Sequence, residues 1–186
     1  NKAGRDGGAV FADADGAVKA RISIEGGAVV GGDAAADANF AQANGGAVAL
    51  SGEGNTLKLD GAALSGNKAG RDGGAVFASG GTVTVTRGSL SKNSAQANGG
   101  AVALSGEGSA LSLESVTLAE NKAESGGAVF ASGKAAVTVR SGLLNKNEAA
   151  ASGGAAAFSG AGGSLTLDGV RLTGNKAGNG GAVFSG

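Results

Sequence analysis

The chain has 186 residues, and its 15 basic and 15 acidic side chains give a formal net charge of zero. This balance provides no field that would attract nucleic acid or an acidic membrane surface. Cys and His are both absent, which excludes disulfides, Cys-based metal or redox sites, and the commonest metal ligand and general base. Gly accounts for 39 residues and Phe for only six, so a core has to be built from Val, Leu, Ile and Ala.

A Gly-Gly-Ala tripeptide recurs along the whole chain and sets its organisation. The regularly spaced copies begin at Gly7, Gly45, Gly73, Gly99, Gly126, Gly153 and Gly180. The first interval is 38 residues and the later ones are 26 to 28. A fixed period of this length is typical of a solenoid, in which each unit buries its apolar face against its neighbours.

Each repeat predicts short β-strands and no helix. The triplet Val83-Thr84-Val85 alternates apolar and polar residues, the pattern of a half-buried strand, and Gly/Ser turns flank it. Seven positions after the start of each such triplet comes another apolar residue, in the column Val29, Leu64, Leu90, Leu118, Leu144 and Leu172. We predict an all-β fold: a parallel β-helix with about 27 residues per coil, three short strands per coil, and six to seven coils.

An Asn precedes each of these seven Gly-Gly-Ala tripeptides by five or six residues, in the column Asn1, Asn39, Asn67, Asn93, Asn121, Asn147 and Asn175. Stacked coils lie about 4.8 Å apart, so each side-chain amide can bond the Asn of the next coil. We predict a structural ladder, with an Asn-lined binding groove as the alternative.

The position directly after each ladder Asn is occupied by Lys2, Phe40, Lys68, Ser94, Lys122, Glu148 and Lys176. We interpret this as a solvated face with spaced charges, not as a basic patch.

Bulky residues alternate between two adjacent positions after each Gly-Gly-Ala, as in Phe11-Ala12 and Ala49-Leu50. Adjacent strand residues point to opposite faces, so one of the two rows faces outward. The candidate outward apolar row is Phe11, Phe77, Phe130 and Phe184. It would serve either to relieve crowding between coils or as an apolar stripe for adhesion or lateral association.

The first full coil departs from the repeat, and we predict an irregular coil with loop insertions over residues 12–44. The insertions carry the carboxylates Asp13, Asp15, Asp33 and Asp37. These would offer oxygen ligands to Ca²⁺ if the two loops converge. No other metal site, no cofactor and no catalytic residue is predicted. The pair Arg5-Asp6 recurs as Arg71-Asp72, and we interpret it as a surface ion pair at a turn.

Two motifs carry a resemblance to a known family. Leu64-Ser65-Gly66-Asn67 precedes Gly73-Gly74-Ala75-Val76, and Leu172-Thr173-Gly174-Asn175 precedes Gly180-Gly181-Ala182-Val183. These units resemble the Phe-x-x-Asn and Gly-Gly-Ala-Ile/Leu/Val repeats of the chlamydial polymorphic membrane proteins, although Leu replaces Phe here. The resemblance implies a right-handed β-helix of an autotransporter passenger, exported to the bacterial outer surface and acting in adhesion and virulence.

We therefore expect residues 1–186 to form a single β-helical segment, open at both ends, of a longer extracellular surface protein. It would be a rigid stalk or adhesin, with no enzymatic activity and no membrane span, that binds a host-cell receptor or glycan. The alternative is a structural subunit that polymerises head to tail into an extracellular filament. A third hypothesis, a polysaccharide-acting enzyme, requires a clustered acidic groove.

Overall fold

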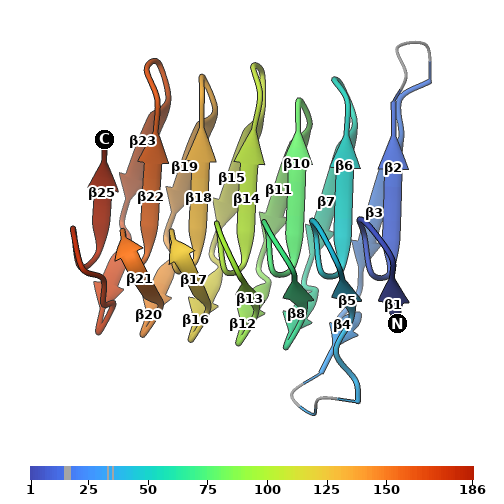
Figure 1. Ribbon diagram of the computed structural model, residues 1–186, viewed down its shortest axis with the longest axis horizontal. Coiled ribbons are helices and arrows are strands. Elements are labelled where there is room, and N and C mark those ends of the chain that lie inside the picture. The colour runs from blue at the N-terminus through green and yellow to red at the C-terminus, as the bar shows by residue number, and fades with distance from the viewer. Residues whose placement is uncertain (15–17, 33, 35) are drawn as a thin grey trace.

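The computed structural model describes residues 1–14, 18–32, 34 and 36–186. These residues form a β-solenoid in which four parallel sheets surround one narrow core, and the chain winds in a right-handed sense (Figure 1). The predicted parallel β-helix is confirmed. The described ranges contain no helix, and therefore none that could span a membrane.

Each coil contributes strands to four sheets, here named A to D. Sheet A consists of β1 (Lys2–Ala3), β5 (Phe40–Ala41), β9 (Lys68–Ala69), β13 (Ser94–Ala95), β17 (Lys122–Ser125) and β21 (Glu148–Ser152). Sheet B consists of β2 (Val10–Asp13), β6 (Val48–Ser51), β10 (Val76–Ser79), β14 (Val102–Ser105), β18 (Val129–Ser132), β22 (Ala156–Ser159) and β25 (Val183–Ser185). Sheet C consists of β3 (Arg21–Glu25), β7 (Thr56–Asp60), β11 (Thr82–Thr86), β15 (Ala110–Glu114), β19 (Ala136–Arg140) and β23 (Ser164–Asp168). Sheet D consists of β4 (Val29–Gly31), β8 (Ala63–Ser65), β12 (Ser89–Ser91), β16 (Thr117–Ala119), β20 (Leu143–Asn145) and β24 (Arg171–Thr173).

A full coil thus has four strands, where the sequence predicts three. The additional strand is that of sheet A, which follows the ladder Asn and has only two residues in four of its six members, such as Lys68–Ala69. Two residues are too few to show the alternation that identifies a strand in sequence. The coil count agrees with the prediction, because the four sheets contain six or seven strands each.

The core is a stack of aliphatic side chains from sheets B, C and D. In β11, Val83 and Val85 are fully buried, and they pair with Leu57 and Leu59 in the preceding coil. In sheet D the inward column is Leu64, Leu90, Leu118 and Leu144, but its first member is Val30 rather than the predicted Val29. Gly26 and Gly27 make the first turn one residue longer, so Val29 pairs with Ala63 and is 68% exposed.

The first coil also contains the longer connections predicted within residues 12–44. Seven residues separate β2 from β3, whereas four separate β6 from β7. Eight residues separate β4 from β5, whereas two separate β8 from β9. The strands that flank both insertions still pair in register with the second coil, so the insertions change the loops without interrupting the sheets.

The two glycines of each Gly-Gly have different physical roles. In the seven regularly spaced Gly-Gly-Ala tripeptides the first glycine has a positive φ, between 57° and 67°, a conformation that residues other than glycine adopt at a cost. The second glycine lies against the neighbouring coil, where a Cβ on Gly100 would overlap the carbonyl oxygen of Gly127. The motif therefore combines a turn requirement with a close approach between coils.

Replacing Gly100 with Ala should destabilise the protein far more than replacing Gly133. Gly133 has a positive φ, but a Cβ there meets no atom within 4 Å, so Gly133→Ala should cost only the left-handed strain of about 1–2 kcal/mol. Gly100 has no positive φ, but its Cβ would overlap the backbone of the next coil, so Gly100→Ala forces two coils apart. Thermal unfolding of both variants measures the difference. Equal losses would contradict the close approach of the coils.

The ladder asparagines form a continuous column at the corner between sheets D and A. Each Nδ2 donates to Oδ1 of the Asn in the next coil, at 2.8 to 3.1 Å from Asn1 through to Asn175. Nδ2 also donates to a carbonyl of the preceding coil, as Asn93 does to Leu64 at 2.9 Å. In the central coils Oδ1 accepts a second hydrogen bond from a backbone N–H, as Asn121 does from Asn93. Each central amide thereby has a full set of hydrogen bonds.

Replacing Asn121 with Ala should lower the free energy of unfolding by about 3 kcal/mol or more. The change leaves two buried donors of Asn93 without partners and removes one hydrogen bond from the carbonyl of Leu90, at about 1–3 kcal/mol for each unpaired donor. Asn1 is exposed, and among the described residues its side chain bonds only Asn39, so Asn1→Ala should cost less than about 1 kcal/mol. Urea unfolding of both variants tests this, and similar losses at the two ladder positions would refute it.

Candidate binding surface

A charged groove runs along the corner between sheets D and A, directly outside the Asn ladder. It encloses about 700 Å³, and two columns of side chains form its rims. One rim is the residue before each ladder Asn, namely Lys92, Glu120 and Lys146. The other is the residue after it, namely Ser94, Lys122, Glu148 and Lys176. The corner lies where β12, β16 and β20 meet β13, β17 and β21 along the lower side of Figure 1.

The six charged side chains of this groove are exposed and alternate in sign along each rim. Lys122 Nζ lies 3.0 Å from Glu148 Oε2 in the next coil, with both side chains more than half exposed. Glu148 in turn pairs through its backbone with Lys176. The predicted solvated face is therefore one rim of a groove. The sequence interpretation missed the opposite rim, because Lys92, Glu120 and Lys146 belong to a turn rather than to a strand.

The first rim stands on a strained backbone. Lys92, Glu120 and Lys146 have φ values of 53° to 58°, in the left-handed region that residues other than glycine rarely adopt. Gly66 and Gly174 occupy the equivalent positions in other coils, also with positive φ. Charged residues replace glycine at this position in three consecutive coils. This replacement is visible in the sequence and could have indicated the second rim of the groove.

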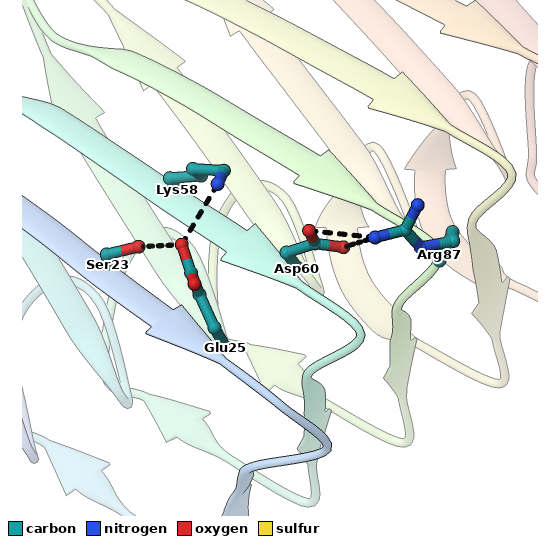
Figure 2. Close-up of polar contacts among 5 residues, drawn as sticks. All are labelled: Ser23, Glu25, Lys58, Asp60 and Arg87. Atoms are coloured by element: carbon teal, nitrogen blue, oxygen red, sulfur yellow. Dashed lines mark hydrogen bonds and ion pairs between the residues drawn. The ribbon is translucent and has the colours of Figure 1, made fainter.

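A second set of charges lies on the outer face of sheet C (Figure 2). Glu25 Oε1 accepts hydrogen bonds from Ser23 Oγ at 2.6 Å and from Lys58 Nζ at 2.9 Å. Arg87 donates from one nitrogen to both oxygens of Asp60, at 2.7 and 2.9 Å. The Lys58 contact joins β7 to β3, and the Arg87 contact joins the turn after β11 to the end of β7. Exposed ion pairs of this kind contribute little to stability.

The hydroxyl of Ser23 and, after it, the ammonium of Lys58 hold the pKa of Glu25 below its usual value. A lowered pKa in the folded state favours folding above the pKa of the unfolded chain, and this contribution disappears as the pH falls through the folded value. In the Ser23→Ala and Lys58→Gln variants, the pKa of Glu25 should rise. Side-chain carboxyl NMR titration measures it, and added salt should weaken only the lysine effect. An unchanged pKa in both variants would contradict these contacts.

The Phe row lies on the outer face of sheet B. Phe11 is 51% exposed, and Phe77, Phe130 and Phe184 are half-buried, whereas Leu50, Leu104 and Phe158 of the adjacent row are buried in the core. Small residues separate the outward rings, since Ala49 pairs with Phe11 on one side and with Phe77 on the other. Ala49 is only 1% exposed, which favours the packing interpretation. The apolar stripe for adhesion stays a prediction.

The calcium candidates do not converge in the part of the chain that can be described. Asp13 is the last residue of β2, and Asp37 lies between β4 and β5, at opposite sides of the coil in Figure 1. Asp15 and Asp33 lie outside the described residues. No group of three acidic side chains arranged for a metal ion occurs within the described ranges.

The recurring Arg-Asp pair has a different role from the predicted surface ion pair. Asp6 Oδ1 accepts a hydrogen bond from the backbone N–H of Asn44 at 2.9 Å, and Asp72 accepts one from Asn98 at 3.1 Å. Asn98 also donates its side-chain amide to Asp72 at 2.9 Å. Both carboxylates therefore tie one turn to the turn of the next coil.

Comparison of the chain with models of protein families, with curated proteins and with solved structures finds no match. The family resemblance of the Leu-x-x-Asn and Gly-Gly-Ala-Val motifs therefore stays a sequence-based interpretation.

Proposed function

We propose that this chain is a rigid segment of an extracellular bacterial surface protein that presents a repetitive binding surface. The observation that carries the proposal is the recurrence of the same surface every two coils. Residues 1–12 are identical to residues 67–78, and residues 41–54 are identical to residues 95–108. The coils are stacked in register, so identical copies lie at equivalent places along one axis. A ligand with repeated groups gains affinity from such an array without any new type of contact.

The construction of the solenoid supports a role as a stalk. Parallel backbone pairing, the Asn ladder and the Gly-Gly contacts join every coil to the next one. A parallel solenoid has no free sheet edges along its length, because each strand is paired on both sides except in the terminal coils. The bacterial surface, and attachment to the outer membrane in the parent protein, are proposed from the motif resemblance.

Beads coated with the full chain should attach to host-cell monolayers several-fold more than beads coated with the Gly100→Ala variant. The two coatings have nearly the same composition, but in the variant two coils cannot pair. The comparison therefore measures how much of the attachment depends on the folded surface. Microscopy counts the attached beads after washing. Equal attachment of the two coatings would refute a binding role of the folded array.

Electron microscopy of the purified chain over a concentration series distinguishes the stalk segment from the alternative, a subunit that polymerises head to tail into a filament. A stalk segment should give short particles at every concentration. Filaments that lengthen with concentration would replace the stalk proposal with self-assembly as the function, because a contact between unlike ends does not close on itself.

A further inference from the structure

The charged groove between sheets D and A has the features of a site for an extended, negatively charged polymer. We propose that it binds a linear polysaccharide that carries a carboxylate on alternate sugars, lying parallel to the axis of the solenoid. This inference rests on the proposed surface-binding role and names the class of ligand.

The charge of the groove selects an anion. Four lysines and two glutamates line it, which leaves two positive charges in excess in a chain whose formal net charge is zero. The Lys122–Glu148 contact is exposed on both sides, so a polyanion can compete for the ammonium group at little cost. The amide groups of Asn93 and Asn147 are already used in the ladder. The groups that can bind the ligand are therefore the ammonium groups and the Ser94 hydroxyl.

The spacing of the lysines selects the polymer. Lys92 and Lys146 lie two coils apart on one rim, and Lys122 and Lys176 lie two coils apart on the other. The two rims are offset by one coil, so the lysines recur every two coils, about 10 Å at about 4.8 Å per coil, only along a single rim. An extended sugar unit is about as long as one coil is high, so carboxylates on every second sugar recur at the interval of the lysines on one rim. Duplex DNA, with one charge per about 1.7 Å, is far denser, and the groove offers no aromatic side chain on which bases could stack.

The left-handed rim indicates that these side chains are not required by the fold. Gly66 and Gly174 adopt the same turn without strain, whereas an L side chain there costs about 1–2 kcal/mol. Lys92, Glu120 and Lys146 nevertheless hold this position in three consecutive coils. The same left-handed conformation occurs at Arg87, Ser115 and Ser141 between sheets C and D, so what distinguishes the groove is that all three of its left-handed residues other than glycine are charged.

Affinity electrophoresis of the full chain at low and high salt tests the proposal with three polysaccharides and a DNA oligonucleotide. Hyaluronan carries one carboxylate per disaccharide, polygalacturonate carries one per sugar, and dextran is neutral. We expect hyaluronan to bind most tightly, with an affinity that falls as salt increases. Preference for polygalacturonate, equal binding of dextran, or tighter binding of a DNA oligonucleotide would each overturn the assignment.

Charge-matched variants separate the groove from the overall charge. Lys146→Gln with Lys176→Gln removes two groove ammonium groups and should weaken hyaluronan binding about five- to tenfold. Lys58→Gln with Lys134→Gln makes the same change in net charge outside the groove, on sheet C and at the turn that follows sheet B, and should leave binding within about twofold. Glu120→Gln with Glu148→Gln should strengthen binding. Equal losses in the two lysine variants would overturn the groove assignment.

The substituted side chains are exposed, so thermal unfolding should show each variant folded. If hyaluronan does not bind while coated beads still attach to cells, the polysaccharide site is wrong and the surface-binding proposal survives. If neither binding nor attachment occurs, both proposals fail.

Discussion

Backbone pairing between consecutive coils places every residue of this protein beside its own copy in the next repeat. At a separation of about 4.8 Å, a position that suits one coil must suit all of them. The core therefore consists of columns of Leu and Val, and the corner between sheets D and A is a column of Asn whose amides bond along the axis. The requirement for glycine at position 100 has the same origin, because at this distance a Cβ would overlap the backbone of the next coil.

The same constraint organises the surface. Large rings at Phe11 and Phe77 are separated by Ala49, and like charges at Lys122 and Lys176 are separated by Glu148. Crowding and like-charge repulsion between neighbours one coil apart are both relieved when the pattern alternates. The surface therefore repeats every two coils, and identical side chains lie two coil heights apart instead of one. The proposed polysaccharide site uses this doubled interval.

The turns tolerate strain where the sheets do not. Apart from glycines, the left-handed residues of the described ranges lie at the corners, at Lys92, Glu120 and Lys146 beside the groove and at Arg87, Ser115 and Ser141 between sheets C and D. Arg87 combines such a backbone with an ion pair to Asp60 in the preceding coil. The corners can therefore vary in sequence, and carry charge, while the strands between them keep their pattern.

The sequence by itself determined the architecture, because the period, the Asn column and the alternation in Val83-Thr84-Val85 are visible without coordinates. Only the tertiary structure decided which row faces the core, that Val30 replaces Val29 in its column, and that Asp6 and Asp72 bond the next turn. It also revealed the short strands of sheet A and the groove. Periodicity reports which residues are equivalent. The direction of a side chain depends on pleat, bulge and turn geometry, and these are settled only when the coils stack.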